Sequence, residues 1–389
     1  MKYLPVQKGK RFCKTSVCLV ALLATIQISG CANKRILDEN AMSFVVGYDL
    51  YGKDMVRGTV VYPVINPFAQ EKIQVISGVN RTSKGVRDVF DLQMDKKPVA
   101  GQLRISLYNE ELARKGIMHM VDSLYRDPSV GTRLYLGIVE KDCYSLLTKP
   151  FKEEGNIGNY LFEMLDHNIR EERIPSSTMH EFLRSYYSEV SDPALPLFTL
   201  KGDEAIIKGV AILQKDKMVG WISPREAFLM KLIINRFRDG DYQASIPSKK
   251  LAPKSADGEK NVDVVLDTLS SYSRINLISR GTPEFKVKVG IKARILEVSK
   301  QVNLGDEKVL AVLSDEIGKE IEQGLLQLTH KLKQMKADPM GFGDYYHAFA
   351  KHNHPHREKV KREDWQRIYA KAKISYDVKV ELLRSGSID

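Results

Sequence analysis

The sequence predicts an α+β (mixed α/β) protein built from two or three domains. Its 389 residues exceed the roughly 250–300 residues at which a single hydrophobic core stops growing. Strand-like blocks alternate irregularly with helix-like blocks, which favours α+β over a doubly wound parallel sheet. Hydrophobic residues make up 43% and charged residues 28%, so a disordered chain is excluded. Only four Cys occur in so long a chain, which excludes a disulfide scaffold.

The first thirty residues have the three parts of a secretory signal peptide. Residues 1–14 carry five Lys or Arg and no acid, and residues 17–28 (VCLVALLATIQI) are uncharged. This apolar stretch is shorter than the about 20 residues that a spanning helix needs. Ile28-Ser29-Gly30-Cys31 then has the pattern of a bacterial lipobox. We therefore predict that residues 1–30 are removed and that the thiol of Cys31 carries a diacylglyceryl group. The alternative is a plain signal peptide with an incidental Cys.

Removal of this segment lowers the net charge of the chain. The whole chain carries +11, but five of its 60 basic residues lie in the signal, which leaves 55 against 49 acids, or +6. So small an excess is a weak argument for nucleic acid, and we predict no nucleic-acid partner. Two acyl chains suffice for stable attachment, so we expect an extracytoplasmic protein tethered to a membrane that it does not cross. Whether the amino group of Cys31 also takes an acyl chain (N-palmitoyl) is left open.

The first half of the remaining chain alternates strands and amphipathic helices. Residues 32–43 are polar and typical of a short tether. Within the next part, Gly116 is able to divide one helical pattern into two pieces, and Cys143 is expected to be a buried small residue rather than a reactive thiol. The predicted elements are strands over 44–50, 58–65 and 134–139 and helices over 109–127, 157–169 and 179–186. The proline-containing linker 191–196 then breaks helix and strand alike.

The second half begins with a hairpin, because residues 206–213 and 218–222 flank a polar turn. Ser223-Pro224-Arg225-Glu226 follows as a capping box with Pro at the first helical position, and it opens a helix through Ile233. The remaining predicted elements are a polar loop over 246–260, two or three strands within 262–298, a long helix over 306–336, shorter helices over 345–350 and 365–372, and a final strand over 375–383.

No recognised catalytic motif occurs in the chain: GxSxG, P-loop, GxGxxG, HExxH and CxxC are all absent. We therefore predict no catalytic residues, no enzyme activity and no cofactor. His347, His352, His354 and His356 could in principle share a Zn or Cu ion. However, Pro355 interrupts the tract and the residues that follow are basic, so a solvated helix end fits better. We predict no metal site, and the role of this cluster is left open.

A basic stretch at 351–373 holds eight Lys or Arg and three acids. It could face lipid phosphates or an acidic partner. The alternative is an ordinary exposed helix face, packed through Trp365 and Ile368.

Several short segments, in order and at matching intervals, resemble a known family. After the lipobox ending in Cys31, they are Pro63-Val64-Ile65-Asn66-Pro67, residues 111–117 leading to Asp122 and Tyr125-Arg126-Asp127, residues 192–196, 207–211, 217–221 and 338–343, and Trp365 before the closing strand. Together they resemble the Ger(x)C family, the lipoprotein C subunits of the nutrient germinant receptors of endospore-forming bacteria. Two departures occur: Ala32-Asn33 replaces a common Trp-Asp, and His356 follows Pro355 where the family often has Trp.

The resemblance implies three domains, each a small, mostly antiparallel sheet packed with helices. We expect them at 31–195, 196–260 (hairpin plus helix) and 261–389 (with the long helix). It also implies attachment to the outer face of the spore inner membrane, through the acylated Cys31, beside integral-membrane A and B subunits. The predicted function is that of a lipid-anchored, non-enzymatic subunit of a membrane germinant receptor complex, required for nutrient-triggered spore germination.

Two alternatives come from other classes. The first is an extracytoplasmic substrate-binding lipoprotein of a transporter, which needs two lobes of regularly alternating strand and helix around a cleft. The second is a lipid-anchored hydrolase, which needs convergent polar groups in a pocket.

Overall fold

The computed structural model divides into two compact units, Met1–Asn40 and Ala41–Asp389. The second unit holds the fold, and the first contributes only Asn40 to the described residues. Cys31, the predicted signal peptide and most of the predicted tether therefore lie outside the described part. The structure describes residues 40–42, 45–63, 73–94, 97–149, 157–234, 240–251, 261–279, 282–300, 302–353 and 360–383. None of the helices in these ranges is long and apolar enough to cross a membrane.

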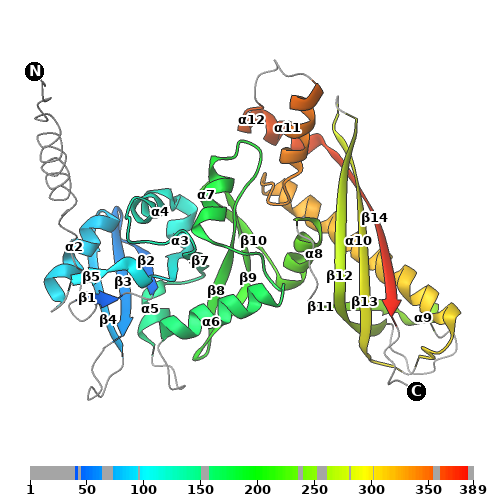
Figure 1. The fold of residues 1–389 in the computed structure, drawn as a ribbon, viewed down its shortest axis with the longest axis horizontal. Coiled ribbons are helices and arrows are strands. Elements are labelled where there is room, and N and C mark those ends of the chain that lie inside the picture. Colours follow the sequence, from blue (N-terminus) through cyan, green and yellow to red (C-terminus); the bar gives the residue numbers. More distant parts are fainter. Residues whose placement is uncertain are drawn as a thin grey trace, which may run out of the picture. The chain divides into compact units, whose positions relative to one another are not determined.

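An eight-stranded mixed sheet forms the N-terminal part of this unit (Figure 1). The strand order is β10-β9-β8-β7-β6-β2-β3-β4. The central pairs β2/β6, β6/β7 and β7/β8 are parallel, and the outer pairs are antiparallel. Their bounds are β2 (Val45–Tyr51), β3 (Met55–Pro63), β4 (Ile73–Asn80), β6 (Ile105–Asn109), β7 (Tyr135–Val139), β8 (Ala194–Lys201), β9 (Glu204–Gln214) and β10 (Lys217–Ile222).

Helices cover both faces of this sheet because its central strands are apolar on both sides. In β6, Ile105 and Leu107 join one core cluster with α5 and α6, while Tyr108 joins the other with α3, α4 and α7. The short helix α2 packs on β3 and β4 through Val86 and Phe90. The bounds are α2 (Ser83–Gln93), α3 (Glu110–Lys115), α4 (Met118–Tyr125), α5 (Cys143–Thr148), α6 (Ile157–Arg170) and α7 (Met179–Tyr187).

Local signals in the sequence set several of these boundaries. Gly116 has φ +120° and ends α3 where the sequence predicts a break, so that α4 starts two residues later. The predicted capping box before α8 (Pro224–Ile234) is also confirmed. There the Ser223 N–H donates to Glu226 Oε2 over 2.7 Å, and the Glu226 N–H donates back to Ser223 Oγ over 3.3 Å.

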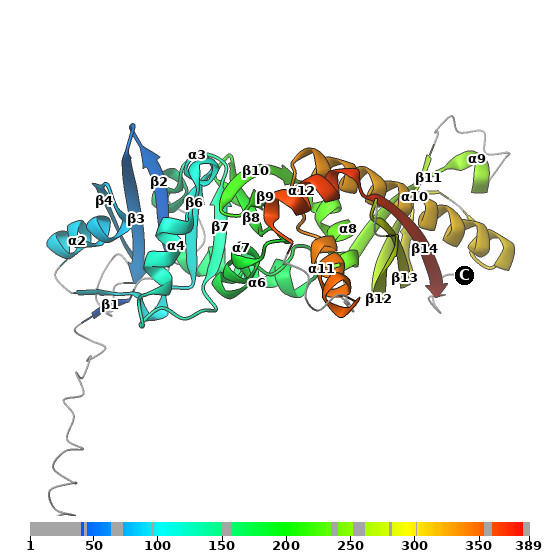
Figure 2. The ribbon, with the colours of Figure 1, turned by 90° about the horizontal axis from the view of Figure 1, so that it is seen from above.

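A four-stranded sheet and a 28-residue helix form the C-terminal part (Figures 1 and 2). The strand order is β11 (Asp241–Pro247), β12 (Asn261–Ser279), β13 (Glu284–Val298) and β14 (Lys373–Leu383). β13 and β14 run parallel and are joined through α10 (Glu307–Gln334), while the other pairs are antiparallel. Alternate residues of β13, from Phe285 to Ile295, pack under α10, and the residues between them point away from it.

The remaining elements are short. They are β1 (Asn40–Met42), β5 (Lys97–Val99), a 3₁₀ turn (Ala100–Gln102), α9 (Ser248–Leu251), α11 (Phe342–Asn353) and α12 (Arg362–Lys371).

The mixed α+β fold class is confirmed. The three-domain division stays a prediction, and two observations bear on its boundaries. β8 starts at the predicted boundary near 195, and the 206–222 hairpin extends the N-terminal sheet. Sequence reasoning missed β4, β6, β8, α2 and α5. The prediction that residues 191–196 break helix and strand alike is wrong at its end, because β8 begins at Ala194 and pairs with β9, and β11 occupies the start of the predicted polar loop.

Candidate functional site

The residues singled out from the sequence do not form a reactive centre within the described ranges. Cys31, His354 and His356 lie outside these ranges, and the side chain of His352 is likewise not described. His347 is half-buried on α11. No group of three or more His, Cys, Asp or Glu residues within the described part is arranged to hold a metal ion.

Cys143 is buried at the start of α5, as the sequence predicts. Its Sγ lies 3.6 Å from the carbonyl oxygen of Tyr48. Burial, with the nearby Asp49 carboxylate, raises the pKa of this thiol well above its usual value. A buried thiol that stays protonated is a poor nucleophile, so its role is to fill the core between β2 and α5.

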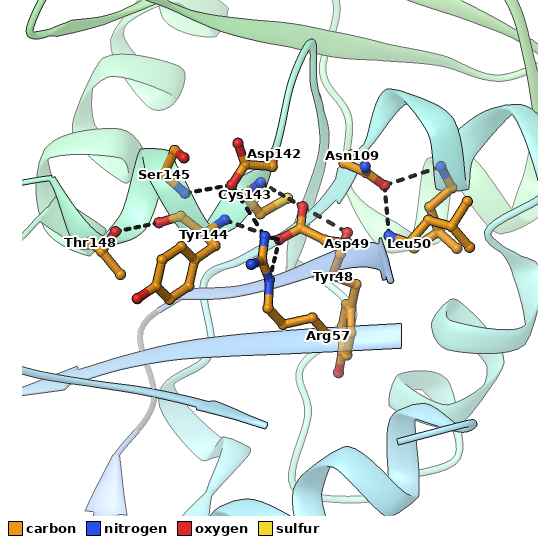
Figure 3. A network of polar contacts seen from close by, with 11 residues as sticks. Tyr48, Asp49, Leu50, Arg57, Asn109, Asp142, Cys143, Tyr144, Ser145 and Thr148 are labelled. Atoms are coloured by element: carbon orange, nitrogen blue, oxygen red, sulfur yellow. Dashed lines mark hydrogen bonds and ion pairs between the residues drawn. The ribbon is translucent and has the colours of Figure 1, made fainter. Parts of the chain in front are cut away.

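The surrounding polar network is structural (Figure 3). The buried Asp49 on β2 accepts hydrogen bonds from the backbone N–H of Cys143 over 2.6 Å and of Tyr144 over 3.1 Å. The Arg57 guanidinium on β3 bridges Asp49 at 3.1 Å and Asp142 at 3.2 Å. Asp142 in turn caps α5 through the Ser145 N–H. Every carboxylate here has donors, so the network attaches α5 to the sheet and leaves no group free for chemistry.

A second buried network joins the linker after α7 to the C-terminal helices, and we call it the linker hub (Ser188, Ser191, Asp192, Asp338 and Arg362). The Arg362 guanidinium of α12 pairs with Asp192 Oδ1 and donates to the carbonyls of Ser188 (2.5 Å) and Ser191 (3.0 Å). Asp192 Oδ2 accepts from the Asp338 N–H over 3.0 Å. The side chains of Arg362 and Asp192 are only 8% and 4% exposed, so this ion pair is removed from solvent.

Asp338 is the perturbed titratable group of the linker hub. Its Oδ2 accepts from the Gly343 N–H over 2.7 Å, whereas its Oδ1 has no hydrogen-bond partner among the described residues. Burial, together with the neighbouring Asp192 charge, raises the pKa of this carboxyl to about 7. A carboxyl with a pKa near neutrality is a common mark of functional sites, but structural networks shift pKa values in the same way.

A pocket of about 300 Å³ lies beside the linker hub. Its lining comes from α7 and the loop before it, the linker, α8, and the start of α11 with the loop before it. It includes Ser177, Arg184, Asp192, Met230, Met340 and Asp344. Ser177 is fully buried, and its Oγ has no hydrogen-bond partner among the described residues. The pocket mixes hydroxyl, cationic, carboxylate and thioether groups. In this lining the Ser176 hydroxyl donates to Glu181 Oε2 over 2.6 Å. The same carboxylate oxygen accepts from the N–H and the hydroxyl of Thr178 in the capping box of α7, so it is held in the cap of that helix.

The described part of the basic stretch at 351–373 contains buried residues and exposed residues. Trp365 and Tyr369 are buried, and Ile368 is half-buried, so α12 packs as the structural alternative predicts. Lys361, Arg367 and Lys371 are exposed, but Arg362 is buried in the linker hub. Sequence reasoning missed this role because an Arg within a basic run carries no local sign of a partner 170 residues away.

Two family models together match nearly all of the chain after the predicted signal peptide. Residues 33–200 match "Spore germination protein N-terminal domain", and residues 208–386 match "Spore germination B3/ GerAC like, C-terminal". The chain belongs to the Ger(x)C family. This assignment agrees with the resemblance seen in the sequence, and the role of the family is in spore germination.

Relatives of this Ger(x)C protein align with it from end to end. The spore germination protein GerQC of Bacillus cereus is 25% identical over 369 residues, covering 95% of this chain and 98% of the relative. The spore germination protein KC of Bacillus subtilis (strain 168) is 23% identical, covering 94% of each chain. The crystal structure of GerBC matches the fold with a TM-score of 0.55 at 17% identity, over 88% of this chain and 98% of that chain.

Proposed function

We propose that this Ger(x)C chain is a lipid-anchored, non-catalytic subunit of a membrane germinant receptor and is required for nutrient-triggered spore germination. The acylated Cys31 holds it on the extracytoplasmic face of the spore inner membrane, where it assembles with integral-membrane A and B subunits. The observation that carries the proposal is the end-to-end similarity to spore germination proteins, with 94–98% of each of the two relatives above covered.

Two features of the chain support the anchored, non-catalytic form of this function. The lipobox places Cys31 directly after a charged and then apolar segment that is typical of export. The hydroxyl–carboxylate pair in the pocket lining, Ser176 and Glu181, belongs to the cap of α7, which supports a structural role for it. The strand order of the eight-stranded sheet also differs from the two regularly alternating lobes that a transporter-type binding protein needs.

The experiment compares spores that carry the wild-type chain with spores that carry Cys31→Ala. Without the thiol no thioether forms, so we expect the variant to leave the membrane fraction and nutrient-triggered germination to be lost. Fractionation is followed by immunoblot, and germination by the fall in optical density after nutrient addition.

Cys143→Ala is the matched control. It makes the same chemical change at a buried position, so we expect the chain to stay in the membrane fraction and germination to remain intact. A Cys31→Ala chain that still fractionates with membranes and supports normal germination would refute the proposal.

A further inference from the structure

The outward face of the four-stranded sheet carries a cluster of basic side chains around an exposed tyrosine, and we call it the basic patch (Tyr272, Arg274, Lys286, Lys288 and Lys379). All five side chains are exposed. They lie on neighbouring strands, because Arg274 is the register partner of Lys288 and Tyr272 that of Gly290 in β12/β13. Gly290 is in turn the partner of Lys379 in β13/β14. α10 packs on the opposite face of this sheet.

The charge arrangement of the basic patch is unfavourable for the chain by itself. Arg274 and Lys288 lie directly opposite each other, and like charges in that position destabilise a sheet. Lys286 lies two residues from Lys288 on the same face, opposite Asn276. Asp377 is the register partner of Lys288, but no ion pair joins the two within the described residues. Glu284, two residues before Lys286 on the same face, has Lys373 as its register partner. One acid among four bases leaves about three positive charges in excess.

Other basic side chains on the same face of the sheet form ion pairs with acidic neighbours. Arg294 pairs with Asp267 at 2.5 Å, and Lys292 pairs with Glu381 at 3.1 Å. The excess is therefore confined to the basic patch. Natural proteins place like charges opposite each other in this way mainly at functional sites. An anionic group from another molecule would relieve the repulsion here.

Apolar side chains alternate with these charges. The Tyr272 ring lies against Gly290, where an added Cβ would come within 2.0 Å of it, and the ring is 52% exposed. Ile278, two residues beyond Asn276, is 62% exposed. Tyrosine and aliphatic side chains among Lys and Arg match the headgroup region of a bilayer, where the rings enter the interface and the cations meet phosphates.

We propose that the basic patch binds the anionic phospholipid surface of the membrane to which the chain is tethered. This inference rests on the proposed function, because the tether would bring the patch to that surface. Each basic residue near an anionic leaflet raises partitioning about fivefold, so reversal at three positions lowers it about 100-fold or more.

The test uses the chain from residue 31 onward with Cys31→Ala, so that no acyl chain contributes, and vesicles of phosphatidylcholine with or without 30% phosphatidylglycerol. We expect sedimentation with anionic vesicles, weak binding to neutral ones, and loss of binding in 0.5 M salt. The triple variant R274E/K286E/K288E loses binding, and the neutral variant R274Q/K286Q/K288Q loses most of it.

The matched control is K53E/R81E/K84E, which makes the same change in net charge at three exposed positions outside the basic patch. It should bind anionic vesicles like the parent. Equal loss in the control and patch variants would refute the proposal, because net charge alone would then govern binding. Failure of the parent to bind anionic vesicles would also refute it and would favour an acidic protein surface as the partner.

A single variant separates binding from folding. Arg274→Glu gives Lys288 an acidic cross-strand neighbour and places no acid opposite Asp377, so the urea midpoint should rise while vesicle binding falls about tenfold or more. A variant that loses binding and stability together would contradict the proposal. Vesicle binding is independent of the Cys31 germination test, so failure of one is distinguishable from failure of the other.

Discussion

Replacement of Arg362 by Met tests whether the linker hub holds the two parts of the molecule together. The guanidinium is 8% exposed and contacts Asp192 and the carbonyls of Ser188 and Ser191. Its removal leaves the Asp192 carboxylate buried with two backbone donors, from Asp338 and Lys215, and without a counter-charge. Loss of one member of a buried ion pair costs about 3–5 kcal/mol, and we expect that decrease in the free energy of unfolding.

Urea unfolding followed by circular dichroism measures this decrease, with the slope of the transition checked for two-state behaviour. Arg126→Met is the matched control, because Arg126 pairs with Asp122 on the surface and is 76% exposed. Such a pair contributes about 0.5 kcal/mol or less. The double variant R362M/D192N removes both charges and should recover part of the loss. If R362M lies within about 1 kcal/mol of R126M, the linker hub does not have the stabilising role inferred here.

Three further predictions follow from individual contacts. The pKa of Asp338 is raised to about 7 in the folded protein, so the protonated carboxyl stabilises the fold in acid and this stabilisation is lost as the pH rises through 7. Asp338→Asn should remove this pH dependence. Urea midpoints of the parent and the variant at pH 5 and pH 8 check it. Gly343→Ala places a Cβ 2.2 Å from the carbonyl oxygen of Val190 and should lower the free energy of unfolding by about 1–3 kcal/mol, although Ala has the better helix propensity. Gly131→Ala is the control, because Gly131 has open space around it and the free energy of unfolding should change by less than about 0.5 kcal/mol. Cys143 should react with a thiol reagent only after unfolding, and rapid labelling of the native Cys31→Ala chain would contradict its burial.

The sequence predicts most helices and strands of this fold because their apolar residues repeat clearly. α10 shows this best, with Leu313, Ile317, Ile321, Leu325 and Leu328 all buried on one side. α2 was missed because it buries only Val86 and Phe90 among its apolar residues and is otherwise polar. α5 has only six residues, and its position depends on Asp49 from a distant strand. Short or polar elements of this kind are fixed by tertiary contacts, which periodicity does not report.

The candidate sites likewise differ in whether a local sequence pattern or a tertiary contact defines them. Cys31 stands in a local pattern that the sequence contains in full, so its predicted role needs no structure. Arg362 and Asp192 form a pair only after the chain has folded, and neither has a sequence neighbour that indicates burial. The basic patch is similar, since Arg274 and Lys288 become neighbours only through the β12/β13 register.

The eight-stranded sheet has a consequence for how this family can be divided or recombined. The two family models meet between residues 200 and 208, yet β8 before that point pairs with β9 after it. A gene fragment that stops there would leave β8 as an unpaired edge with an apolar surface, which favours aggregation. It would also separate Asp192 from Arg362. Exchange between family members is therefore expected to keep both segments from one parent, so that they are inherited as a single unit.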